Sequence, residues 1–129
     1  MNTVLLVDDD DLLRGAMSIN LKRCGFTVVE ACDGGEAIDK AAGARPDVVL
    51  LDLVMPNVDG IEALRSLRDL VPDAKFIVMS GGTQNTDPGM YLKMAMALGA
   101  HAAIRKPFTN EQLIAAVTDM QQPAASNLA

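Results

Sequence analysis

Two apolar segments of this chain end directly in aspartates, and this pattern limits the possible folds more than any other feature. Residues 3–7 run into Asp8 and Asp9, and a second apolar run ends in Asp52. A carboxylate is costly to bury alone, and bringing three such groups together adds charge repulsion. The sequence therefore predicts a divalent metal ion and a cationic side chain at these ends. Lys106, far downstream, is the candidate cation.

Apolar segments alternate with segments of helical period along the whole chain. Apolar and β-branched runs predict five strands, at residues 3–7, 27–30, 47–51, 75–79 and 101–104. Apolar residues spaced three and four apart predict a helix after each strand, the second of them alanine-rich and weaker. Strict alternation implies right-handed crossovers and a parallel sheet with helices on both faces. We expect an α/β fold in one domain, residues 1–122, followed by a disordered tail at 123–129.

Local signals at the predicted helix ends support this division. Three pairs of residues have the spacing of a capping box: Asp33 and Glu36, Asp59 and Glu62, and Thr109 and Gln112. Gly25 and Gly99 stand where two helices should end, because glycine tolerates the left-handed conformation that is common there.

The charge and the cysteines exclude several classes of function. The chain has 129 residues and a formal net charge of −6, so a basic nucleic-acid surface is not expected. No apolar stretch approaches the ~18 residues of a membrane span, and we expect a soluble, cytoplasmic protein. Cys24 and Cys32 match neither a zinc spacing nor a disulfide-rich scaffold. We expect two reduced and largely buried thiols.

Four short strings at the predicted strand ends resemble those of bacterial two-component response-regulator receiver domains. They are Val7-Asp8-Asp9-Asp10, Leu51-Asp52-Leu53-Val54-Met55-Pro56 with Asp59-Gly60, Met79-Ser80-Gly81 and Lys106-Pro107-Phe108. Each string alone is weak, but the four in this order are specific, and the resemblance covers roughly residues 3–121. It implies a stand-alone receiver with a flavodoxin-like, doubly wound (βα)5 fold. It also implies the strand order 2-1-3-4-5, for which a receiver is itself the reference example.

The resemblance further implies a magnesium site. Asp9, Asp52 and the backbone carbonyl of Val54 would ligate Mg²⁺, and Asp8 would act through a coordinated water. Mg²⁺ suits this role because it is bound by one or two carboxylates, keeps several waters and also takes phosphoryl oxygens.

The same resemblance makes Asp52 the phosphoacceptor, forming an aspartyl phosphate. Lys106 would supply positive charge to the phosphoryl oxygens, and Ser80 would donate a hydroxyl hydrogen bond to them. A sensor histidine kinase or a histidine phosphotransferase would provide the phosphoryl group, and the phosphorylated chain would then bind a partner protein. It would catalyse only its own phosphorylation and dephosphorylation. We expect a monomer, or a weak dimer through the face formed by the fourth helix, the fifth strand and the fifth helix.

Two positions depart from the pattern of the family. Receivers usually carry Tyr or Phe three residues before the lysine, and here that position is Ala103. The segment 81–89 is longer than is common and rich in turn formers. Because a methyl group has no rotamer to switch, we hypothesise that output uses ordering of this loop instead of an aromatic switch.

Two alternatives remain open at this stage. Asp8-x-Asp10 after the first strand superficially fits the nucleophile of a haloacid-dehalogenase-type phosphatase, and Asp52→Asn would discriminate the two readings. A receiver-shaped binding module that is never phosphorylated is the other. His101, the single histidine, is expected at the opposite edge of the sheet as a half-exposed surface residue.

Overall fold

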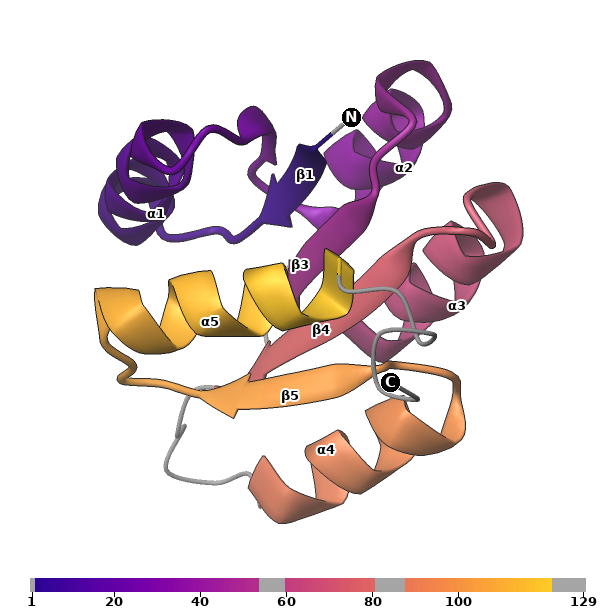
Figure 1. Cartoon of the computed structure of the whole chain (residues 1–129). Coiled ribbons are helices and arrows are strands. Elements are labelled where there is room, and N and C mark those ends of the chain that lie inside the picture. The colour runs from indigo at the N-terminus through magenta and orange to yellow at the C-terminus, as the bar shows by residue number, and fades with distance from the viewer. Residues whose placement is uncertain (1, 54–59, 81–87, 122–129) are drawn as a thin grey trace, which may run out of the picture.

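Five parallel strands form one sheet, and helices cover both of its faces (Figure 1). This computed structural model describes residues 2–53, 60–80 and 88–121. The strands are β1 (Thr3–Val7), β2 (Thr27–Ala31), β3 (Val48–Asp52), β4 (Lys75–Ser80) and β5 (Ala102–Arg105). The helices are α1 (Asp11–Arg23), α2 (Gly34–Ala44), α3 (Gly60–Leu70), α4 (Pro88–Ala97) and α5 (Asn110–Gln121). The tail predicted at 123–129 lies outside the described residues. Of the loop predicted at 81–89, residues 81–87 also lie outside them, and α4 begins at Pro88.

The strand order is β2-β1-β3-β4-β5, which confirms the predicted doubly wound fold. In such a sheet the carboxyl ends of the strands share one edge, where ligands bind. The register brings the polar ends to a common height, because Val7 lies level with Leu51 on the neighbouring strand. Asp8 and Asp52, the next residues, therefore leave adjacent strands side by side.

The sheet divides the apolar core into two layers. Strand β3 is buried along its whole length, as expected for a parallel strand covered on both faces. Leu5 and Val49 face the layer formed with α2, α3 and α4, whereas Val4 and Leu50 face the layer formed with α1 and α5. This alternation of side chains fixes the register, since a slip of one residue would exchange the two layers.

Two of the three predicted capping boxes lie in the described residues. At the start of α5, Thr109 Oγ1 accepts from the backbone N–H of Gln112, and the Gln112 side chain accepts from the Thr109 N–H. At the start of α2, Asp33 Oδ1 accepts from the Glu36 N–H at 2.8 Å. The pair at residues 59 and 62 cannot be followed, because residue 59 lies outside the described part.

Two other expectations meet different outcomes. Gly25 and Gly99 have φ of 95° and 105°, so both occupy the left-handed region predicted for these helix ends. The expectation of largely buried thiols is wrong, because Cys24 is exposed and Cys32 is half-buried. Cys24 is the C-cap of α1 and lies three residues beyond Leu21, the last buried residue of that helix. Among the helices of the described residues, none is long and apolar enough to cross a bilayer.

Candidate functional site

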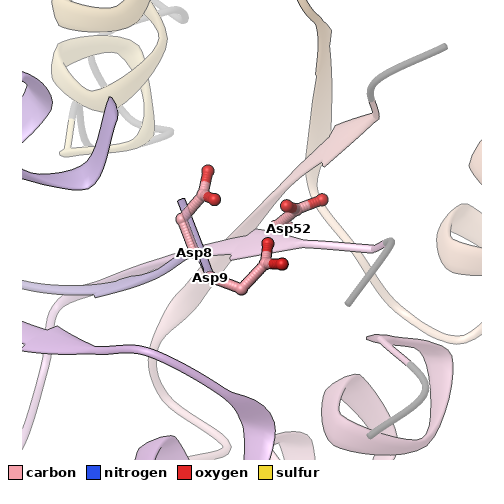
Figure 2. A group of neighbouring side chains, drawn as sticks. All are labelled: Asp8, Asp9 and Asp52. Carbon is pink, nitrogen blue, oxygen red and sulfur yellow. The ribbon is translucent and has the colours of Figure 1, made fainter. Parts of the chain in front are cut away.

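Three aspartates meet at the carboxyl edge of the sheet (Figure 2). Asp8 follows β1 and is fully buried, and Asp52 ends β3 and is 3% exposed. Asp9 is exposed beside them. One carboxylate oxygen from each of the three lies within 4.8 Å of the other two. The structure thus brings together the three carboxylates that the sequence singled out.

Lys106 compensates the two buried carboxylates. Its ammonium Nζ donates to Asp8 Oδ2 at 2.8 Å and to Asp52 Oδ2 at 3.1 Å. Burial lowers the pKa of the Lys106 ammonium, but its hydrogen bonds and charge attraction to Asp8 and Asp52 outweigh burial, so this pKa is raised above its usual value. Lys106 is therefore a fixed positive charge between two acids, as predicted for a cation at this edge.

The backbone beyond the strand ends holds the cation in place. The Lys106 N–H donates to the Ser80 carbonyl at 2.8 Å, and the Leu53 N–H donates to the Met79 carbonyl at 3.0 Å. The strand pairing thus continues one residue past the ends of β3 and β5, at Leu53 and Lys106. Ser80 is 3% exposed and ends β4, next to the strand end that carries Asp52.

The donor set fits a hard divalent cation. Ligand oxygens on opposite sides of Mg²⁺ lie about 4.2 Å apart, and Ca²⁺ accepts somewhat larger separations. The three carboxylate oxygens all lie within 4.8 Å of one another, which is close enough for the group to hold one such ion. Hard oxygens are the ligands that both ions prefer. The acidic cluster can therefore bind a divalent metal ion.

The remaining predicted residues have separate outcomes. Val54, predicted to ligate through its carbonyl, lies outside the described residues. Ala103 is exposed on β5 and pairs with Val78 of β4. His101 is exposed at the far end of the sheet, as predicted, where its ring stacks on Phe76 with centroids 6.4 Å apart.

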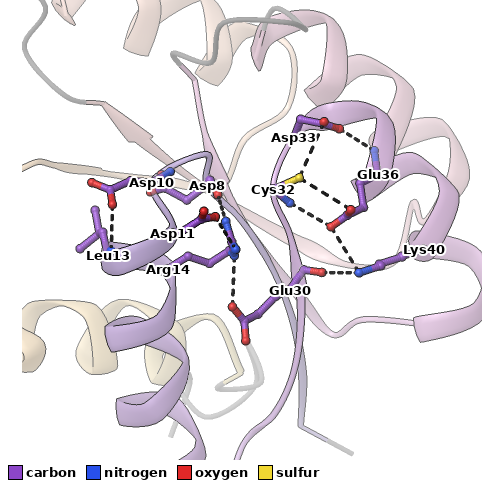
Figure 3. A network of polar contacts seen from close by, with 10 residues as sticks. All are labelled: Asp8, Asp10, Asp11, Leu13, Arg14, Glu30, Cys32, Asp33, Glu36 and Lys40. Carbon is purple, nitrogen blue, oxygen red and sulfur yellow. Dashed lines mark hydrogen bonds and ion pairs between the residues drawn. The ribbon is translucent and has the colours of Figure 1, made fainter.

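Sequence reasoning missed a polar network behind the site (Figure 3). Arg14 of α1 contacts the Asp8 carbonyl, Asp11 and Glu30. The i,i+3 spacing of Asp11 and Arg14 was a usable signal, because such pairs meet on one helix face. The other two contacts join α1 to Asp8, just after β1, and to Glu30 of β2, so they depend on the tertiary fold.

Comparisons with known proteins agree with this geometry. The family description "response regulator receiver domain" matches residues 4–118. The response regulator MprA of Mycolicibacterium vanbaalenii is 37% identical over 112 residues, which are 87% of this chain and 47% of that protein. The chain thus spans about half the length of this curated relative.

Solved structures with the same fold include two informative neighbours. Chemotaxis protein CheY4 of Vibrio cholerae superposes with a TM-score of 0.82 at 31% identity, covering 93% of this chain and 98% of that one. A response regulator of Burkholderia pseudomallei, solved with a phosphorylated aspartic acid, a calcium ion and citrate, has a TM-score of 0.82 at 27% identity. That match covers 99% of this chain and 71% of the other. By its matched family, its relatives and its fold, the chain belongs to the response regulator receiver domains of two-component signalling.

Proposed function

We propose that this chain accepts a phosphoryl group on Asp52 and signals through a change in its contacts with a partner protein. The donor would be the phosphohistidine of a sensor histidine kinase or a histidine phosphotransferase. The observation that carries the proposal is the Lys106 ammonium, which contacts both Asp8 and Asp52 at one end of the sheet. The Burkholderia pseudomallei relative, solved with a phosphorylated aspartic acid, supports it.

The chemistry follows from the surroundings of Asp52. A carboxylate oxygen of Asp52 would attack phosphorus while the bond from phosphorus to the histidine nitrogen breaks, and the nitrogen leaves with the electron pair. Lys106 would stabilise the negative charge on the phosphoryl oxygens, because its Nζ already lies 3.1 Å from Asp52 Oδ2. Ser80, at the end of the neighbouring strand, would donate a hydroxyl hydrogen bond to the same oxygens.

We further propose Mg²⁺ as the resident metal, held by Asp9, Asp52 and the Val54 carbonyl, with Asp8 acting through a bound water. When bound, it would neutralise charge on the group being transferred, where positioning and electrostatics supply most of the catalysis. Asp9 is the ligand open to solvent, which gives the ion a path of entry. The chain would catalyse only its own phosphorylation and dephosphorylation, in the cytoplasm.

The phosphatase alternative is not favoured by the surroundings of its nucleophile. Asp8 would have to attack the substrate, yet both of its carboxylate oxygens already accept hydrogen bonds, Oδ1 from the Asp10 N–H and Oδ2 from Lys106. Asp10, the second acid of that motif, caps α1 by accepting from the Leu13 N–H at 3.1 Å. Both carboxylates are therefore committed to other contacts.

Incubation with Mg²⁺ and acetyl phosphate tests the acceptor. Intact mass should show one phosphoryl group on the wild type and none on Asp52→Asn, because the amide cannot form the acyl phosphate. Asp39→Asn, at an exposed position of α2, is the matched control and should be phosphorylated normally. Phosphate retained by Asp52→Asn would support the phosphatase reading. A wild type that takes up no phosphoryl group and shows no NMR change with beryllofluoride would support the non-phosphorylated module.

The route of output is proposed separately. Ala103 offers only an exposed methyl group where the family usually has an aromatic ring, so we propose that ordering of the loop at 81–89 transmits the signal. Hydrogen exchange of the amides of residues 81–92, with and without beryllofluoride, tests this. Unchanged protection would overturn it. Any dimer would form through the face of α4, β5 and α5, and sedimentation with and without beryllofluoride would detect it.

A further inference from the structure

Arg14 links the end of β1 to two neighbouring elements. It lies in the first turns of α1, and its side chain is only 15% exposed (Figure 3). Its guanidinium donates to the Asp8 carbonyl at 2.7 Å through Nη1, to Asp11 Oδ1 at 2.8 Å through Nη2, and to Glu30 Oε1 at 3.1 Å through Nε. Arginine suits this position because its planar, forked donors hold several acceptors in fixed directions.

With the contact from Arg14 to the Asp8 carbonyl, every polar group of Asp8 has a hydrogen-bond partner. The Asp8 N–H donates to the Ala31 carbonyl at 3.1 Å, Oδ1 accepts from the Asp10 N–H at 2.9 Å, and Oδ2 accepts from Lys106 at 2.8 Å. These contacts orient the amide and the side chain of Asp8. Arg14 orients its carbonyl group, which belongs to the peptide group that joins Asp8 to Asp9.

The carbonyl of Asp8 belongs to the same planar peptide group as the nitrogen and Cα of Asp9. Fixing the direction of this carbonyl therefore fixes where the Cα of Asp9 lies and limits the directions open to its carboxylate. Asp9 is exposed, so core packing does not orient it as it orients Asp8. We infer that Arg14 is a positioning residue for the metal site, acting through the Asp8–Asp9 peptide group to aim the Asp9 carboxylate at the ion. This inference rests on the magnesium site proposed above.

A second reading of Arg14 predicts the opposite sign. If Arg14 acted only as a nearby positive charge, its removal would leave the acidic cluster more negative and would tighten Mg²⁺ binding. If it acted only on stability, the folded variant would bind Mg²⁺ as the wild type does. Of the three roles, only positioning predicts that a folded Arg14 variant binds Mg²⁺ more weakly than the wild type does. The sign of the change in Mg²⁺ affinity therefore separates the three roles.

The experiment is a Mg²⁺ titration of the full chain followed by NMR of the backbone amides, at a temperature where circular dichroism shows each variant folded. Arg14→Gln should bind Mg²⁺ about tenfold more weakly than the wild type, as is typical when a partner of a metal ligand is lost. Arg23→Gln, at an exposed position of the same helix with the same change in charge, is the matched control and should stay within about twofold. Arg14→Lys should fall between them, because an ammonium keeps the charge but not the fork.

The outcomes separate the inference from the function on which it rests. A wild type that binds no Mg²⁺ overturns the proposed magnesium site and the inference with it. A wild type that binds Mg²⁺, with Arg14→Gln folded and binding as tightly or more tightly, overturns the role of Arg14 alone. If Arg14→Gln does not fold, Arg14→Lys decides: an affinity equal to that of Arg23→Gln overturns the inference, and a loss of about threefold or more supports it.

Discussion

Replacing Lys106 by Met removes the cation shared by two buried carboxylates, and its effect can be worked from the structure. Asp8 is fully buried and Asp52 is 3% exposed, so neither can recover solvation without a rearrangement. Their nearest oxygens lie within 4.8 Å, a separation at which two unit charges repel by about 3.5 kcal/mol at an effective dielectric constant of about 20. Breaking a buried ion pair generally costs about 3–5 kcal/mol. We expect Lys106→Met to lower the free energy of unfolding by about 3 kcal/mol without metal.

Urea denaturation in EDTA, and again in saturating Mg²⁺, measures this change. Mg²⁺ should stabilise Lys106→Met more than the wild type, because the two carboxylates of the variant no longer share an ammonium and bind the ion more tightly. Lys93→Met, at an exposed position of α4, is the control and should change stability by less than about 0.5 kcal/mol. A loss below about 1 kcal/mol for Lys106→Met in EDTA, or an equal Mg²⁺ effect in both proteins, would refute the reasoning.

The pH dependence of the same comparison has a definite sign. The pKa of Lys106 is raised, because its contacts to Asp8 and Asp52 outweigh the effect of burial, which by itself lowers it. A raised lysine pKa gives stabilisation that is complete below the unfolded value of about 10.4 and is lost as the pH rises through the folded value. The stability difference between wild type and Lys106→Met should therefore stay constant from about pH 7 to about pH 9.5.

Three further changes test separate parts of the fold. Ser18→Ala should stabilise the chain by about 1 kcal/mol in urea denaturation, because its buried hydroxyl is the unpaired side-chain group found among the described residues; a loss of stability would contradict this. Gly60→Ala should lower the free energy of unfolding by about 3 kcal/mol or more, because a Cβ would overlap the Leu53 backbone. Gly15→Ala, with open space around it, should raise the free energy of unfolding by about 0.5–1 kcal/mol. Although its residue is exposed, the His101 ring should titrate below 6.5 by NMR, because partial desolvation and the nearby Lys75 and Arg68 cations lower its pKa. Its contribution to stability is then present above pH 6.5 and is lost as the pH falls through the lowered value, and a midpoint above 6.5 would contradict this.

The sequence predicted the sheet well because its strands carry continuous apolar runs that only a covered parallel sheet can bury. The predicted strand boundaries differ from the structure where a polar residue at the end of an apolar run can lie inside or just outside the strand. Residues 47–51 were predicted as a strand, and the structure has Val48–Asp52 instead. Asp47 accepts a hydrogen bond from the Thr3 N–H at 2.8 Å, which pairs its side chain with the start of β1 outside the regular strand.

The candidate site was predictable to the extent that it lies in short strings at strand ends. Asp8, Asp52 and Lys106 meet as expected because parallel strands bring these ends together. Arg14 could not be assigned, because its contact with Glu30 joins residues 16 apart through the fold and has no signature in local spacing. The prediction that Cys24 is buried was wrong for a related reason. Local sequence does not show that burial of α1 ends at Leu21, three residues before Cys24.

The ion pair between Lys106 and Asp8 joins residues 98 positions apart, so it also has a consequence for folding kinetics. Closing so long a loop is entropically costly, and such contacts are formed late unless a nucleus has already brought the strands together. Contacts that are absent from the transition state affect mainly the unfolding rate. The Lys106–Asp8 contact should therefore act mainly on unfolding, so that Lys106→Met unfolds faster than the wild type and refolds at nearly the same rate.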